Sequence, residues 1–332
     1  MHIPDNYLSP QTCAVMGAIM IPVWSAAVKK VKEEVTAEKI PLLGISAAFS
    51  FLVMMFNIPI PGGTSAHAVG ATLIAILLGP YSACIAVSIS LLIQALLFGD
   101  GGILAFGANC FNMAFVIPFA GYFIYSFLKK ILKNTGGNRS EFIIAFSSGY
   151  LAINLAAMFA AVEFGIQPVL FKDASGMPLY CPYGLSVSIP AMLISHLLAG
   201  IVEGIVTSGV LLYIRRMSPG IIHADSTENG KKTVFGPLYI LLAAMTVLTP
   251  VGLIASGTAW GEWAAGELQK LSGNIPAGIE RGLRLNAPLQ DYNLPALKSG
   301  IAGYLISAFS GVALILIIFK IVSSLARRGE EK

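Results

Sequence analysis

The sequence predicts an all-α integral membrane protein, a polytopic helical bundle of about nine transmembrane helices with one re-entrant loop. Three observations indicate this class: hydrophobic residues make up 56% of the 332 positions, charged residues make up only 11%, and the charges cluster so that long uncharged runs remain. A soluble chain carries about 25% charged residues, whereas an apolar run of about 20 residues can cross the hydrocarbon core as a helix. Because the net charge of +4 is spread over turns and forms no basic face with interleaved aromatics, the composition also excludes a nucleic-acid-binding domain.

The expected helices come from nine apolar segments. They lie at residues 8–28, 40–57, 64–79, 81–98, 103–128, 142–162, 183–214, 236–256 and 299–319. If successive helices alternate in direction, three turns (29–39, 129–139 and 215–232) and the tail from Lys320 fall on one side and hold 16 of the 21 Lys and Arg residues. The positive-inside rule makes that side cytoplasmic. We therefore expect the amino terminus outside and the carboxyl terminus in the cytoplasm, with membrane lipid around the spans.

The first span is expected to be retained. Residues 1–28 contain no Lys or Arg, and the basic cluster follows the apolar segment, whereas a secretory signal peptide carries its positive charges ahead of that segment. Since only a few residues precede the span, the terminal amine of Met1 is expected at or within the outer edge of the protein.

One segment departs from regular helix. Residues 57–67 contain two prolines and a Gly-Gly pair, which no helix continues through, yet they carry no charge. The apolar run that follows, 68–78, spans only about 16 Å as a helix. Such a helix cannot cross the core alone, so we expect residues 57–67 to re-enter the protein at membrane depth. Non-helical backbone is tolerated there only where it is buried by protein or lines a polar cavity, which makes this loop a candidate site.

Two of the four histidines, His223 and His196, have explanations other than a metal site. His223 falls in a charged inside turn and is expected to be a solvated loop residue. His196 lies in the seventh apolar segment with Glu203 one heptad later on the same helical face. Ionisable groups inside a membrane are candidates for function, but we favour hydrogen bonds that fix helix packing as the explanation of this pair.

The other two histidines could form a metal site. The terminal amine, the His2 amide nitrogen and His2 Nδ1 can close two fused chelate rings, which places three nitrogens in one plane. His67 from the candidate re-entrant loop could supply a fourth. An all-nitrogen, square-planar set is typical of Ni(II) or Cu(II) and is compatible with low-spin Co(II). Zn(II) prefers a tetrahedron, and Ca(II) and Mg(II) prefer oxygen ligands. A buried His67 without a metal is the alternative that the residues alone leave open.

Two motifs resemble a known family. The opening Met1-His2-Ile3-Pro4-Asp5 with Leu8-Ser9-Pro10, and the loop Gly63-Thr64-Ser65-Ala66-His67, look like the substrate-binding membrane subunit of nickel and cobalt transporters of the energy-coupling-factor (ECF) type, the CbiM/NikM family. Similar Gly/Asn-rich turns occur at Gly99-Asp100-Gly101-Gly102, Gly107-Ala108-Asn109 and Phe111-Asn112-Met113. The resemblance covers roughly residues 1–217 and implies a bacterial or archaeal cell membrane.

The resemblance implies a ligand set at Met1, His2 and His67, where the amine, the amide and two imidazoles hold the metal. Four further groups are expected to orient these ligands, as metal-bound histidines usually require: Asp5, Asn57, Thr64 and Ser65. Two positions depart from the family pattern. Asn6 stands where glycine is usual, which is a mild change because Asn tolerates left-handed backbone. Ala66 replaces a glycine before the loop histidine and bears on how closely the loop approaches the metal.

The last third of the chain is similar to the small companion subunit of the CbiN/NikN type. It offers two spans separated by a long outside loop, 256–298, which contains Asp291-Tyr292-Asn293-Leu294-Pro295. We therefore expect a metal-binding CbiM/NikM-like part at 1–217, a cytoplasmic linker at 218–234 and a CbiN/NikN-like two-helix part at 235–332.

The chain contains no Gly-x-x-x-x-Gly-Lys-Ser/Thr motif, so we expect no ATPase activity of its own by that route. The resemblance implies two kinds of partner, a transmembrane coupling (T) subunit and cytoplasmic ATPase (A) subunits, with Ni(II) or Co(II) bound as substrate and no other cofactor. Small residues at Gly149, Ala152, Ala156 and Ala160 could face the coupling protein or pack within the bundle. Two other classes remain: a self-sufficient secondary transporter of a metal or solute, and a membrane metalloenzyme that uses His196 and Glu203.

Overall fold

The protein is an all-α membrane protein, and its described residues also include two three-residue strands. The computed structural model describes residues 1–37, 39–132, 137–225, 234–255, 257–263, 265–283, 285–297 and 299–330. Within these residues, seven helical stretches are long and apolar enough to cross a membrane. Three of them are single helices: Pro10–Glu34 (α1), Leu185–Met217 (α9) and Gly300–Arg327, which lies in α13 (Gly300–Glu330). Two contain a π-helical part: Pro80–Phe98 consists of α4 (Pro80–Ile93) and η1 (Gln94–Phe98), and Phe106–Ile131 consists of α5 (Phe106–Asn109), η2 (Cys110–Val116) and α6 (Ile117–Ile131). The last two are Asn138–Leu170, with α7 (Asn138–Gly165) and α8 (Gln167–Leu170), and Gly236–Ile254, with α10 (Gly236–Leu248) and η5 (Thr249–Ile254).

Seven such helices, rather than the nine expected, are therefore found among the described residues, and the difference falls on residues 40–79. Helix α2 (Ile40–Met55) has 16 residues and α3 (Ala71–Leu78) has eight. Nearly every residue of both helices is buried. A helix enclosed by other helices need not match the thickness of a bilayer along its own length, which explains why two apolar segments form short helices here.

A β-hairpin occupies the proline- and glycine-rich segment between α2 and α3. Strands β1 (Ile58–Ile60) and β2 (Thr64–Ala66) pair antiparallel, with Ile58 opposite Ala66. Gly62 and Gly63 form the turn at φ 95 and φ 80, a left-handed backbone that favours glycine. The expected break in helical structure at residues 57–67 is confirmed; whether the hairpin lies at membrane depth stays a prediction.

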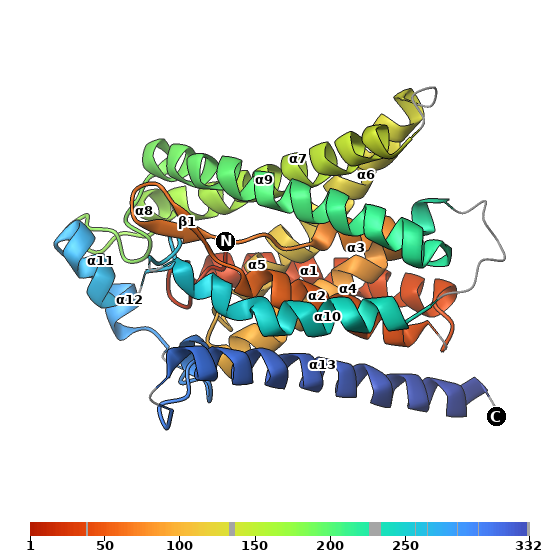
Figure 1. Cartoon of the computed structure of the whole chain (residues 1–332). Helices are drawn as coiled ribbons and strands as arrows, with labels where there is room; N and C mark the ends of the chain where they lie inside the picture. Colours follow the sequence, from red (N-terminus) through yellow and green to blue (C-terminus); the bar gives the residue numbers. More distant parts are fainter. Residues whose placement is uncertain are drawn as a thin grey trace.

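Helices α7 and α9 form the most closely packed pair. Ala152, Ala156 and Ala160 of α7 are fully buried, and a Cβ at Gly149 would meet Thr207 of α9 at 2.9 Å. The small-residue stripe is therefore packed inside the bundle, with Gly149 against α9, and is not available to a coupling protein. Figure 1 shows α7 and α9 running together along one face of the bundle.

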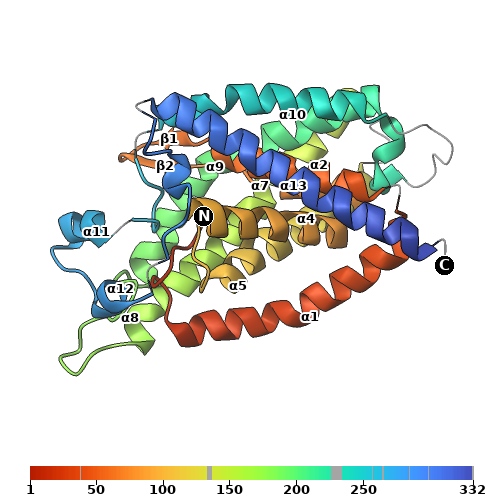
Figure 2. The same cartoon turned by 90° about the horizontal axis from the view of Figure 1, so that it is seen from below.

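The last third of the chain packs against the other face. Helices α10 and α13 contact α2, and the Tyr304 hydroxyl of α13 donates a hydrogen bond to the carbonyl of Met55 (2.6 Å) at the end of α2. Figure 2 shows α10 on the opposite side of the bundle from α1, whereas α13 crosses the bundle diagonally and ends beside the carboxyl end of α1. The connection between them contains α11 (Ala265–Ser272), α12 (Ala277–Arg281) and η6 (Gln290–Tyr292). It lies at the end of the bundle that holds β1, away from the carboxyl terminus (Figure 1). The remaining short elements, η3 (Pro219–Ile221) and η4 (His223–Asp225), follow α9.

Candidate metal centre

The first residues of the chain run as a buried extended segment into the bundle. Met1 is 4% exposed and His2 2% exposed. The segment is fixed by Asn109, whose Oδ1 accepts from the Ile3 N–H (2.7 Å) and whose Nδ2 donates to the Ile3 carbonyl (3.0 Å). The N–H of Gly102 donates to the same carbonyl (2.8 Å). Because Ile3 directly follows His2, these hydrogen bonds also fix the position of His2.

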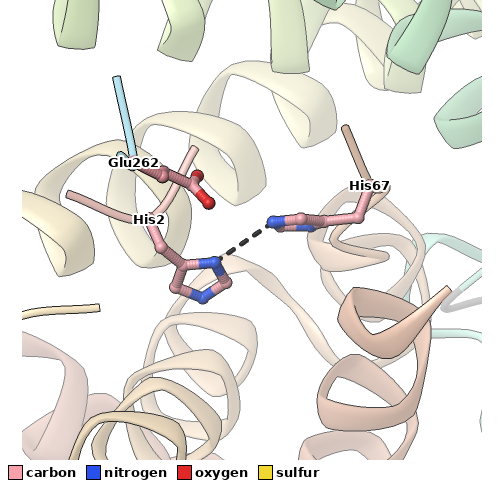
Figure 3. A group of neighbouring side chains, drawn as sticks. All are labelled: His2, His67 and Glu262. Atoms are coloured by element: carbon pink, nitrogen blue, oxygen red, sulfur yellow. Dashed lines mark hydrogen bonds between the residues drawn. The ribbon is translucent and has the colours of Figure 1, made fainter. Parts of the chain in front are cut away.

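His2 and His67 lie side by side although 65 positions separate them. His2 Nδ1 is 3.1 Å from His67 Nε2, and Figure 3 shows these two nitrogens facing each other with the carboxylate of Glu262 beside them. His67 follows β2 directly, so the β-hairpin and the buried α3 position it. Donor atoms of His2, His67 and Glu262 all lie within 4.8 Å of one another.

The outer ring nitrogens have fixed partners. His67 Nδ1 is 3.0 Å from the Ala68 carbonyl and His2 Nε2 is 3.3 Å from Gln94 Oε1. Gln94 turns its oxygen toward His2 because its Nε2 donates to the Tyr292 hydroxyl (2.9 Å) and Asp100 Oδ2 (3.3 Å). Both partners are acceptors, so each ring can donate an N–H outward and leave the lone pair of its inner nitrogen available to a metal ion.

The terminal amine lies at the same place. The Met1 nitrogen donates to Glu262 Oε1 at 2.6 Å, and Asp100 Oδ1 is 3.3 Å from His2 Nδ1. Two carboxylates and two imidazole nitrogens make the position favourable for a cation. A cavity of about 290 Å³ adjoins it and is lined by, among others, Asn57, Ser65, Asp100, Glu262 and Tyr292.

Burial sets the protonation of two groups around the centre. The pKa of His67 lies well below its usual range, first because the ring is buried and then because the terminal ammonium and His2 are near. His67 is therefore a neutral ring at physiological pH, the form that binds metals. Burial, and then the Asp100 carboxylate, raise the pKa of the Tyr292 phenol well above its ordinary value. It stays protonated and donates to Asp100.

The four residues expected to orient the ligands have other positions. Asp5 Oδ1 accepts from the N–H of Leu104 (2.8 Å), so it fixes a neighbouring turn. Asn57 and Ser65 line the adjoining cavity, and Thr64 pairs with Ile60 in the hairpin. None of the four side chains is hydrogen-bonded to His2 or His67 in the described part of the chain, so their orienting role stays a prediction. Sequence reasoning missed Gln94, Asp100, Glu262 and Tyr292 as neighbours of the ligands.

The two departures from the family pattern are accommodated. Asn6 adopts φ 68, the left-handed backbone that Asn tolerates. Ala66 is buried, and its methyl group packs in a small cluster with Ile60 and Ala199.

His196 and Glu203 do not form a pair. His196 Nδ1 bonds to the Met192 carbonyl (2.8 Å), whereas Glu203 Oε2 accepts from the backbone N–H groups of Val69 and Gly70. An acid/base pair that shares a proton directly is therefore not formed. His223 is exposed in η4, outside the centre.

The fold defines a polytopic helical membrane protein, and its candidate metal centre is buried and rich in nitrogen. Residues 2–221 match the family CbiM, described as the cobalt uptake substrate-specific transmembrane region, and residues 237–328 match the PDGLE domain. The chain therefore belongs to the CbiM family and carries a PDGLE, CbiN-like, domain in the same polypeptide. The family resemblance read from the sequence is confirmed.

Similar proteins cover nearly the whole chain. The probable fused nickel transport protein LarMN of Lactiplantibacillus plantarum is 47% identical over 329 residues, which cover 96% of this chain and 97% of that protein. The fused nickel transport protein NikMN of Rhodobacter capsulatus is 45% identical over 336 residues and covers 95% of each chain. Among solved structures, a truncated transition metal transporter is 54% identical with a TM-score of 0.61, covering 65% of this chain and 99% of that one.

Proposed function

We propose that this chain is the substrate-specific component of an ATP-driven ECF-type importer and binds one Ni(II) or Co(II) ion as its substrate. The ligands in this proposal are the Met1 amine, the His2 amide nitrogen, His2 Nδ1 and His67 Nε2. The observation that carries it is the 3.1 Å approach of two imidazole nitrogens beside a buried terminal amine.

The donor set favours nickel or cobalt. An amine, an amide and an imidazole from two consecutive residues close a five-membered and a six-membered chelate ring in one plane, and His67 completes a planar set of four nitrogens. Late first-row ions accept this geometry, whereas Zn(II) prefers a tetrahedron. Two related proteins are named as nickel transporters. Selection between nickel and cobalt is set in part by metal availability, because the Irving–Williams order alone does not determine it.

Binding exchanges protons for the metal. The amine and the amide must each lose a proton before they can ligate. Glu262 already accepts a hydrogen bond from the amine, so the ion that enters replaces this contact. The adjoining cavity, lined by Asp100 and Glu262 among others, is the approach for a hydrated cation. Because Glu262 and Tyr292 both belong to the PDGLE match, the companion part at 235–332 helps to form the entrance to a centre held by the part at 1–217.

The energy for import comes from partners. The chain has no P-loop motif, so a coupling (T) subunit and cytoplasmic ATPase (A) subunits supply it. The amino terminus and the metal centre face outward. The basic turns and the linker at 218–234 lie on the cytoplasmic side, in accordance with the positive-inside rule.

Reconstitution in liposomes tests this function. The purified chain is expected to retain metal but to show no ATPase activity and no uptake, and ATP-dependent uptake is expected when T and A subunits are added. Uptake of nickel by the chain alone would indicate a secondary transporter instead.

A further inference from the structure

Glu203 lies within α9 and is fully buried, and its side chain reaches the loop that carries His67. Its Oε2 accepts from the N–H groups of Val69 (2.7 Å) and Gly70 (2.9 Å). Gly70 is the N-cap of α3. N–H groups at the start of a helix have no partner within that helix, and the helix dipole favours a negative group there. Glu203 of α9 therefore caps α3 from outside.

One peptide unit connects Glu203 to the ring of His67. The carbonyl of Ala68 is 3.0 Å from His67 Nδ1, and the N–H of Val69, at the other end of the same planar unit, donates to Glu203. Hydrogen bonds in such a chain polarise one another. The carboxylate makes the Ala68 carbonyl a stronger acceptor, which keeps the proton on Nδ1 and leaves Nε2 as a lone pair directed at His2.

The same loop is held from two further sides. Ser50 of α2 donates to the Val69 carbonyl (2.8 Å), and Ala66 packs with Ala199, one turn before Glu203 on α9. With both backbone groups of Val69 engaged, a shift of α9 relative to α2 must move the His67 ring or break one of these bonds.

We propose that Glu203 is a positioning residue for metal binding, acting through the peptide between Ala68 and Val69 to fix the tautomer and direction of His67. This inference rests on the proposed role of His67 as a ligand. Groups that orient a metal-bound imidazole through its second nitrogen change metal affinity by about 10- to 100-fold when they are removed.

Glu163 offers a matched control. It is also a buried carboxylate, but it lies on α7, where its Oε2 accepts from Asn112 (2.9 Å), and its hydrogen bonds are made away from the His67 loop. Removal of a buried carboxylate is expected to lower the stability of both variants. A displaced His67 ring is expected only in the Glu203 variant. Glu203→Gln keeps an oxygen that can accept from Val69 and Gly70, and it serves as the conservative rescue.

The experiment compares the full-length wild type, Glu203→Ala, Glu203→Gln and Glu163→Ala, each with an untagged amino terminus. Two quantities are measured: the half-life of bound Ni(II) under a chelator, with its visible absorption band, and amide hydrogen exchange of the metal-free protein at residues 69 and 70. Glu203→Ala is expected to shorten the half-life by about 10- to 100-fold, to shift the band and to accelerate exchange. Glu203→Gln is expected to restore most of the retention, and Glu163→Ala to keep the wild-type half-life and band.

Wild-type retention and an unshifted band in Glu203→Ala overturn the inference, and so does an equal loss in Glu163→Ala. If Glu203→Ala does not fold, Glu203→Asp replaces it, because the shorter side chain keeps the charge but withdraws it from Val69; undiminished retention in that variant overturns the inference. A wild type that holds no nickel refutes the proposed function. In that case the exchange measurement still tests whether Glu203 fixes the peptide between Ala68 and Val69, since unchanged protection of residues 69 and 70 in Glu203→Ala contradicts that contact.

Discussion

Extension of the chain by two residues before Met1 should abolish tight metal binding while leaving the fold largely intact. The Met1 amine is buried and lies 2.6 Å from Glu262 Oε1. An added Ala-Gly converts this amine into a peptide nitrogen. The five-membered chelate ring then loses its terminal donor, and the extra residues must displace the Glu262 carboxylate.

The magnitudes separate metal binding from stability. The contact with Glu262 is a charge-assisted hydrogen bond, a class worth about 1.5 to 3 kcal/mol. Because the Glu262 side chain is 18% exposed, solvent screening places its loss toward the lower value. Removal of a group that orients a ligand lowers metal affinity by about 10- to 100-fold. Removal of the ligand itself should lower the affinity by more. We therefore expect affinity to fall by more than about 100-fold, or roughly 2.8 kcal/mol at 1.4 kcal/mol per factor of ten.

Isothermal titration of the metal-free protein with Ni(II) measures the affinity, and thermal unfolding in detergent measures the stability. The matched control carries the same two residues after Lys332, at the other end of the chain, and should behave as wild type. Undiminished nickel affinity in the amino-terminally extended protein would show that the amine is not a ligand.

Three further outcomes are expected. His67→Ala should lose nickel retention, while its free energy of unfolding should fall by only about 1 to 3 kcal/mol, because buried hydrogen bonds are lost. A variant that does not fold would instead indicate a packing role for this histidine. Nickel affinity, followed by titration over a pH series, should fall as pH falls, because the nitrogen ligands must give up their protons before they bind the metal. Burial lowers the pKa of His67, so this ring competes less with protons than an exposed imidazole would. Affinity that rises on acidification would contradict the nitrogen ligands. Gly204→Val should destabilise the protein by about 1 to 3 kcal/mol, because a Cβ there would lie 2.6 Å from the Phe146 ring; Gly209→Ala on the same helix, where a Cβ meets nothing within 4 Å, is the control, and equal melting temperatures would refute the close packing of α7 on α9.

Local patterns predicted the parts of the fold that depend on local chemistry. The prolines and glycines of residues 57–67 indicated a break in helical structure, and the hairpin β1–β2 lies there. The apolar run 68–78 indicated a short helix, and α3 forms from Ala71. Hydropathy could not distinguish a helix that crosses a membrane from one enclosed by its neighbours, which is why α2 and α3 were counted with the spans.

The candidate centre was predictable only in part. The chelating order of Met1 and His2 is a property of adjacent residues, and the loop around His67 carried its own signal. Glu262 lies 261 positions from the amine that it contacts, in a polar loop without periodicity, so nothing in the sequence placed it there. Gln94 and Tyr292 are 198 positions apart. A lone glutamine in an apolar run is a signal that could have singled out Gln94.

The most direct test of the account is metal analysis, with an absorption spectrum, of full-length protein purified with an unmodified amino terminus. We expect one Ni(II) per chain in a yellow, diamagnetic form, which is the signature of four planar nitrogens. A paramagnetic, octahedral nickel species, or a protein that binds no nickel while its Met1 amine is free, would contradict the central claim.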